Sequence, residues 1–161
     1  MGLTIQIDSR EKAKAIKKII EEFNNQKVTY YTSKLYVGDY MSLDNPKMVI
    51  DRKQNMNEIC GNLCSNKEEH ERFTRELKRA QEVGIKVVIL VEHGHGIKTL
   101  EDVKLWVNPR GVYSPKACQG DRLFKTMTTV QNKYGCTFLF CSKLETGKRI
   151  VDILSGKEVV V

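Results

Sequence analysis

The pattern of hydrophobic and polar positions divides the chain into short strands and helices. Residues 85–91 (Ile-Lys-Val-Val-Ile-Leu-Val) are nearly all apolar, which is typical of a strand covered on both faces. Between Glu11 and Phe23, apolar residues instead recur every three or four positions, as on one face of a helix. These patterns predict strands at 3–8, 28–31, 35–43, 47–52, 85–91 and 136–141, and helices at 11–23, 56–63, 67–82, 100–106, 121–134 and 145–154.

This order of elements predicts an α/β fold, with a mixed β-sheet flanked by helices on both faces. We expect one domain spanning residues 1–161. A turn at Asp44-Asn45-Pro46 is expected to join the strands at 35–43 and 47–52. The segment His93–Gly96 could be a metal-binding histidine pair, but its glycines and its place after a buried strand favour an exposed loop.

The charge balance favours a polyanionic partner. The 161 residues include 27 lysines and arginines against 20 acidic residues, for a net charge of +7. A surplus of this size suits DNA, although solubility alone could also explain it. No apolar run is long enough to cross a membrane, and the first residues have the pattern of a strand rather than a leader, so we expect a cytoplasmic protein with no membrane partner.

The five cysteines do not suggest a disulfide framework, because their number is odd in a chain of this length. Cys60 and Cys64 have helical spacing and could touch one metal or simply face the core. No second pair follows at the spacing of a zinc ribbon, so free buried thiols are the favoured interpretation.

Two strands that follow one another place acidic residues near their ends. Asp39 lies on the first, and Asp51, Arg52 and Lys53 end the second. Because side chains alternate along a strand, Asp51 and Lys53 share one face while Arg52 points away. If the strands pair as a hairpin, Asp39 can lie near Asp51, and two carboxylates can hold Mg²⁺ or Mn²⁺ for phosphodiester hydrolysis. The simpler alternative is that these are ordinary turn and strand-end carboxylates with Lys53 as a surface partner.

Three ordered fragments decide between these interpretations: Ile7-Asp8-Ser9-Arg10-Glu11, Val37-Gly38-Asp39-Tyr40 and Val49-Ile50-Asp51-Arg52-Lys53. Together they resemble the nuclease domain of the XPF-type structure-specific endonucleases, of the PD-(D/E)XK, restriction-endonuclease-like superfamily. The resemblance continues through a helix containing Arg72 and the last strand and helix, and so covers nearly the whole chain.

The resemblance implies a role for each matching position. Asp39 and Asp51 would be metal ligands, Asp51 standing where the family usually has glutamate, and Lys53 would be the catalytic lysine. Asp8 would support the metal site as a further member of the catalytic set. The remaining matches would contact phosphate or brace the site, and they are Arg10, Glu11, Arg52 and Arg72.

One position departs from the family pattern. The aspartate that follows the family's Glu-Arg-Lys corresponds to Asn57, which brings no charge, with Glu58 beside it. Either Glu58 substitutes for the missing aspartate, or the chain keeps the fold as an inactive DNA-binding or partner-binding domain. The favoured expectation is an Mg²⁺- or Mn²⁺-dependent endonuclease acting on branched, flapped or distorted DNA.

The family usually also carries a tandem helix-hairpin-helix module after the nuclease domain, and the sequence shows none. We therefore expect a stand-alone version, of bacterial or phage origin, acting in the cytoplasm of a prokaryotic or phage-infected cell. Its DNA targeting would come from the domain itself, from a homodimer or from a partner protein.

Overall fold

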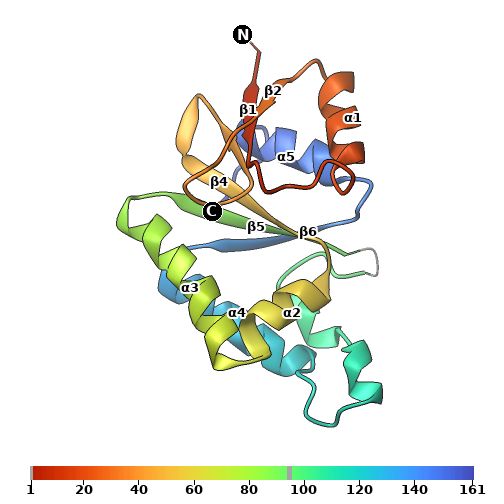
Figure 1. Cartoon of the computed structure of the whole chain (residues 1–161). Helices are drawn as coiled ribbons and strands as arrows, with labels where there is room; N and C mark the ends of the chain where they lie inside the picture. The colour runs from red at the N-terminus through yellow and green to blue at the C-terminus, as the bar shows by residue number, and fades with distance from the viewer. Residues whose placement is uncertain (1, 94–95) are drawn as a thin grey trace.

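A six-stranded mixed β-sheet with helices on both faces forms the molecule, as the computed structural model of residues 2–93 and 96–161 shows (Figure 1). β1 pairs in parallel with β2 and antiparallel with β3, β3 pairs antiparallel with β4, and β4, β5 and β6 are parallel to one another. In spatial order the strands are β2 (Thr29–Thr32), β1 (Thr4–Ile7), β3 (Tyr40–Ser42), β4 (Asn45–Lys53), β5 (Lys86–Glu92) and β6 (Thr137–Cys141).

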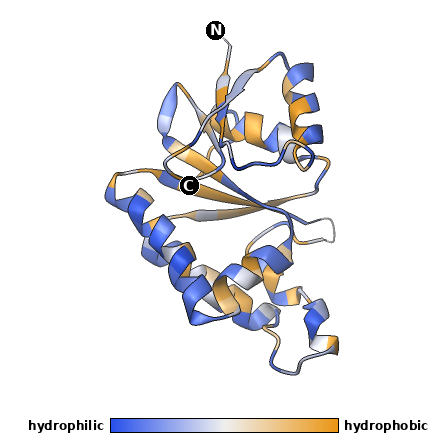
Figure 2. Cartoon of the chain, viewed as in Figure 1, coloured by the Kyte–Doolittle hydropathy of each residue, from blue (hydrophilic) through white to orange (hydrophobic). Residues whose placement is uncertain are grey.

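The alternation of side chains along β5 separates two hydrophobic cores. Val87, Ile89 and Val91 pack into one core, and Val88 and Leu90 into the other. The first core is covered by α2 (Met56–Cys64), α3 (Lys67–Glu82) and α4 (Gly120–Tyr134), and the second by α1 (Lys17–Asn25) and α5 (Thr146–Leu154). Figure 2 shows hydrophobic colour along the central strands and mostly hydrophilic colour on α3. The predicted α/β fold is therefore confirmed, and none of the helices in the described part of the chain is long and apolar enough to cross a membrane.

Helix α3 shows how closely local sequence determines a boundary. Asn66 caps its first turn by accepting a hydrogen bond from the main-chain amide of Glu69 at 2.8 Å. Phe73 and Leu77, four residues apart, are buried on the face toward the sheet. The helix ends just before Gly84, whose φ of +74° gives the left-handed termination that the glycine predicts.

Two predicted elements are shorter than expected. The first helix begins at Lys17 rather than Glu11, because Glu11 lies in a turn. Its main-chain amide donates to the Asp8 carbonyl, and its carboxylate pairs with Arg52. The strand predicted at 35–43 is reduced to β3, since the chain bends through residues 36–39. At this bend Gly38 has a φ of +79°, a left-handed conformation that a strand residue does not adopt.

The hairpin between β3 and β4 also differs from the prediction. Its turn lies at Leu43–Asp44, because Ser42 pairs with Asn45, and Pro46 lies inside the irregular first part of β4. Proline is tolerated there because the register shift leaves it outside the paired positions. The helix predicted at 100–106 is a 3₁₀ helix, η1 (Glu101–Leu105), followed by a second, η2 (Pro109–Val112).

Candidate active site

Asp39 is held at the entrance to β3 by main-chain contacts on both sides. Its amide donates to the carbonyl of Ile50 at 2.8 Å, and its own carbonyl accepts from the amide of Asp8 at 2.8 Å. The carboxylate oxygen Oδ2 accepts a hydrogen bond from the main-chain amide of Arg52 at 2.8 Å. Gly38 makes this close approach possible, because a Cβ at that position would lie 2.9 Å from the Cβ of Val49.

Asp51 and Lys53 lie two residues apart on β4 and share one face of the sheet, as the alternation of strand side chains predicts. The Lys53 Nζ is 3.5 Å from the Asp51 Oδ1, and the two side chains are only 11% and 13% exposed. The ammonium group also lies 5.1 Å from the centre of the Phe73 ring on α3. A lysine held between a carboxylate and an aromatic face keeps its charge inside the site.

The carboxyl groups of Asp39 and Asp51 form an interacting pair. Their like charges act on one another, which favours retention of a proton when no cation is present. Burial, and then the neighbouring charge of Asp51, raises the pKa of Asp39 to about 9. Burial likewise raises the pKa of Asp51, against the lowering effect of Lys53. Two carboxyl groups that cannot both be ionised in the absence of a cation are suited to binding one.

A divalent cation fits this pair. Mg²⁺ is commonly bound by one or two carboxylates, with waters and substrate phosphate supplying the other oxygens. Asp39 and Asp51 offer such a set, and a bound cation would replace the proton that their raised pKa values favour. Burial would lower the pKa of Lys53, but the charges of Asp51 and Glu58 raise it, so the lysine is cationic and available to an anionic substrate.

Asp8 lies next to Asp39 in the fold, since its main-chain amide donates to the Asp39 carbonyl. It is fully buried, and its Oδ1 accepts from the main-chain amide of Leu35 at 2.8 Å. Its Oδ2 accepts from the Nε of Arg10 at 2.7 Å, and the Arg10 side chain is 64% exposed. Asp8 thus anchors the segment that leads to Asp39, while Arg10 carries a positive charge at the surface nearby.

Arg52 points to the opposite face, as predicted, and organises a buried ion network there. Its Nε is 2.8 Å from the Glu11 Oε2 and its Nη1 is 2.7 Å from the Glu92 Oε1. The Tyr40 hydroxyl donates to the same Glu11 oxygen at 2.7 Å. These contacts place Glu11 and Arg52 in one buried ion-pair network. Glu92 is a further member that the sequence analysis missed, although a charged residue ending an apolar strand was a visible signal.

Asn57 and Glu58 face different surroundings. Glu58 closes a capping box at the start of α2: its amide donates to the Asn55 side chain at 2.8 Å, and its Oε1 accepts from the Gln54 amide at 2.7 Å. Its charge also contributes to the raised pKa of Asp51.

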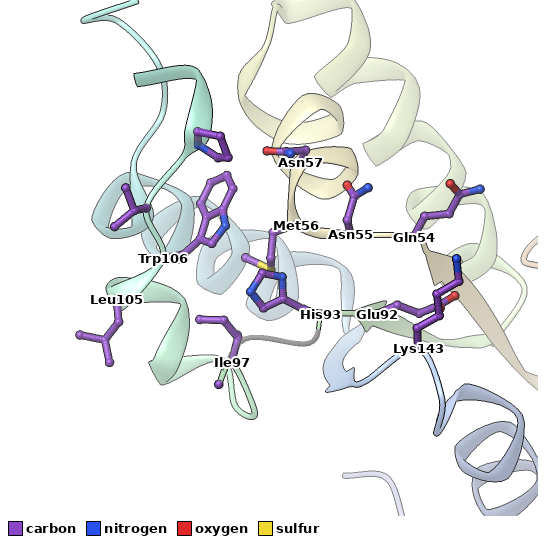
Figure 3. Close-up of a pocket in the computed structure, with 13 residues that line it drawn as sticks. Gln54, Asn55, Met56, Asn57, Glu92, His93, Ile97, Leu105, Trp106 and Lys143 are labelled. Carbon is purple, nitrogen blue, oxygen red and sulfur yellow. The ribbon is translucent and has the colours of Figure 1, made fainter. Parts of the chain in front are cut away.

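Asn57 instead lines a cavity of about 810 Å³ together with Trp106 and Glu92 (Figure 3). Within residues 2–93 and 96–161, no hydrogen bond joins Asn57 to either aspartate of the pair. Of these two adjacent residues, Glu58 is therefore the one whose charge acts on Asp51. The neighbouring loop includes Gly94 and His95, which lie outside the described residues, so the structure does not test the histidine pair.

Helix α3 contributes one residue that the sequence analysis singled out and one that it did not. Arg72 is exposed and pairs with Glu69 at 2.9 Å, and no contact among the described residues brings it to the carboxylates. Glu76, three residues after Phe73 and so on the same side of the helix, adds to the charges that raise the pKa of Asp51. That helical spacing was the available signal for Glu76.

Comparison with solved structures identifies the same fold. The structure of XPF from Aeropyrum pernix is similar, with a TM-score of 0.67 and 20% identity, covering 96% of this chain and 64% of that one. XPF from Aeropyrum pernix in complex with DNA gives a TM-score of 0.63 and 18% identity, covering 99% of this chain and 68% of that one. The chain thus spans about two thirds of the length of these structures.

Sequence comparison gives the family. No curated protein matches the chain. The sequence profile of the ERCC4 domain, however, matches residues 7–153, a range that contains all three motifs and both carboxylates of the pair. The chain therefore belongs to the ERCC4-domain family of nucleases.

Proposed function

We propose that the protein is an endonuclease that hydrolyses phosphodiester bonds in DNA with Mg²⁺ or Mn²⁺ held by Asp39 and Asp51. The observation that carries the proposal is the buried carboxyl pair with Lys53 3.5 Å from Asp51. Two carboxylates and one ammonium group provide a cation site next to a phosphate site.

Each residue of the site has a distinct task in this reaction. The Arg52 amide holds the Asp39 carboxylate in one orientation, and Asp51 directs Lys53 toward the same side. Lys53 stabilises the negative charge that develops on the phosphate oxygens in the transition state. A bound divalent cation would supply a water of lowered pKa as the nucleophile. The expected products carry a 5′-phosphate and a 3′-hydroxyl.

Exposed basic residues supply the DNA contacts in this proposal. Arg10 lies beside the site, and Arg72 lies on α3, the helix that also supplies Phe73. Other exposed lysines and arginines follow β5, and they are Lys98, Lys104, Arg110, Lys116, Arg122 and Lys125. Contacts of this kind position a nucleic acid without reading its sequence, which suits recognition of branched, flapped or distorted DNA by shape.

DNA targeting could be completed by a second copy of the chain or by a partner protein. The structures of XPF from Aeropyrum pernix are longer than this chain. Sedimentation of the protein alone and with flap DNA would separate a monomer from a dimer.

The first experiment is cleavage of labelled single-stranded, duplex, flap and fork DNA by purified protein with Mg²⁺, Mn²⁺ or EDTA. We expect cleavage that depends on the cation and is abolished in Asp51→Ala. Cleavage that persists in EDTA or in Asp51→Ala would overturn the assignment of the site.

A second variant tests the lysine. We expect Lys53→Ala to lower the cleavage rate by about 10²–10³-fold while DNA binding changes little. Lys18→Ala, which removes an exposed charge from α1 on the opposite face, is the matched control and should cleave normally. A Lys53→Ala protein that cuts as well as the unaltered one would contradict the mechanism.

One observation favours a second candidate function, a non-catalytic DNA-binding or partner-binding domain. Asn57 replaces an acidic residue of the family pattern and faces the cavity beside Trp106 rather than the carboxyl pair. This alternative predicts salt-sensitive DNA binding without cleavage on any substrate, and a cation affinity unchanged in Asp39→Asn.

A further inference from the structure

Three cysteines that are far apart in the sequence meet at one point of the fold. Cys60 and Cys64 lie one turn apart on α2, and Cys118 lies just before α4, 58 residues after Cys60. Their three Sγ atoms all lie within 4.8 Å of one another. Cys60 and Cys118 are buried and Cys64 is partly exposed. The residues that separate them in sequence include the whole of α3 and β5, so only tertiary packing brings them together.

The spacing is close to that of a thiolate metal site. Zinc binds sulfur at about 2.3 Å in a tetrahedral arrangement, which places ligand sulfurs about 3.8 Å apart. A set already within 4.8 Å needs only small side-chain rotations to close on a cation. The same three cysteines line a cavity of about 410 Å³, which leaves room for water at a fourth coordination position.

The surroundings of the cluster also suit bound thiolates. The Asn108 side-chain amide lies 3.8 Å from the Cys60 Sγ and donates to the Cys118 carbonyl at 2.9 Å. Such N–H groups orient metal-bound ligands.

We propose that Cys60, Cys64 and Cys118 bind one Zn²⁺ ion, with water from the cavity as the fourth ligand. Binding releases the thiol protons of the coordinating cysteines into solvent. The ion joins α2 to the segment that contains η2 and leads into α4. Because sulfur ligands select zinc over magnesium, this site is chemically independent of the Asp39–Asp51 pair.

Titration of the reduced protein with Co²⁺, a coloured substitute for Zn²⁺, tests the proposal. We expect binding of one equivalent with thiolate-to-cobalt charge-transfer absorption, and displacement by Zn²⁺ but not by excess Mg²⁺. Cys118→Ser should weaken binding by more than about 100-fold, because losing even a hydrogen bond to a ligand costs about 10–100-fold. Cys136→Ser, at a buried cysteine outside the cluster, should bind as the unaltered protein does. Absence of the band, or a band that survives Cys118→Ser, would overturn the proposal.

A measurement on the unaltered protein avoids any folding defect of the variants. Alkylation followed by mass spectrometry reports how fast each cysteine reacts. We expect Zn²⁺ to slow the alkylation of Cys64 at least about tenfold and to raise the midpoint of thermal unfolding. An alkylation rate of Cys64 that is indifferent to Zn²⁺, or a disulfide within the cluster that forms equally fast with Zn²⁺ present, would count against a metal site. Neither result depends on DNA cleavage, so it leaves the nuclease proposal separately testable.

Discussion

The carboxylate of Asp39 accepts a 2.8 Å hydrogen bond from the main-chain amide of Arg52. Arg52 lies between Asp51 and Lys53 on β4. This one hydrogen bond therefore connects the Asp39 carboxylate to the strand that carries Asp51 and Lys53. The side chain of Arg52 meanwhile holds Glu11 and Glu92 on the opposite face. Arg52 thus connects the Asp39–Asp51 site to the buried ion pairs with Glu11 and Glu92.

The raised pKa of Asp39 leads to a prediction about pH. The pKa of Asp39 is raised from 3.8 to about 9, so the folded chain binds the Asp39 proton more tightly than the unfolded chain. Without a divalent cation, the free energy of unfolding should therefore fall as pH rises between these values. Thermal unfolding in EDTA across that range measures the effect, and added Mg²⁺ should restore stability at the alkaline end.

The variant Asp39→Asn tests the cause of that pH dependence. The asparagine can still accept from the Arg52 amide but brings no charge next to Asp51. In EDTA at pH 8 it should be more stable by about 1 kcal/mol or more, or about 2–4 °C in melting temperature, and Mg²⁺ should no longer stabilise it. Asp44→Asn, at an exposed position in the hairpin turn, should leave the profile unchanged. A destabilised Asp39→Asn protein in EDTA would be the contrary result.

Alanine substitutions at two separate glycines, Gly38 and Gly84, test how the bend before β3 positions Asp39. Gly38 and Gly84 have nearly equal φ values, +79° and +74°. A Cβ at Gly38 would lie 2.8 Å from the Val49 Cγ2, whereas nothing lies within 4 Å of one at Gly84. We expect Gly84→Ala to cost about 1 kcal/mol from backbone strain alone, and Gly38→Ala to cost more and to lower cleavage. Urea unfolding and a cleavage assay measure both, and equal costs would show that the contact with Val49 is unimportant.

The buried ion network should be sensitive to loss of its central residue. Arg52→Leu leaves two carboxylates buried without their partner, which typically costs about 3–5 kcal/mol. The pair between Lys148 and Asp152, 2.7 Å apart with the lysine side chain 60% exposed, gives the comparison, because Lys148→Met should cost far less than Arg52→Leu. Urea denaturation at neutral pH measures both variants. Similar losses in the two would mean that the buried network contributes little.

The positions Asn57 and Glu58 can be distinguished by their effects on cation binding. Glu58→Gln keeps an acceptor for the Gln54 amide but removes a charge that acts on Asp51. Calorimetric titration should therefore show weaker Mn²⁺ binding, with little change in melting temperature. Asn57→Asp should have the smaller effect, since that side chain lines the cavity beside Trp106. If Asn57→Asp instead tightens Mn²⁺ binding more than Glu58→Gln weakens it, position 57, where the family pattern has aspartate, is the one that acts on the cation.

Several features of the protein were predictable because they depend on neighbours in the sequence. The bounds of α3 follow from its Asn66 cap, its apolar spacing and Gly84. The common face of Asp51 and Lys53 follows from the two-residue period of a strand. The position of β5 in the sheet interior follows from its continuous apolar run. In each case the determining interaction lies within one element or its cap.

Other features were decided only when distant segments packed together. The bend at Gly38 shortens the predicted strand, and it packs against Val49 on β4, which leaves no room for a side chain there. Glu92 joins the site through Arg52, 40 residues away, and Cys118 completes a cluster with Cys60 at a separation of 58 residues. No local period relates such positions, because their distance is set by the order of strands and by which helix covers which face. The sequence by itself determined the elements and the faces of their side chains, whereas the tertiary structure decided which of those side chains meet.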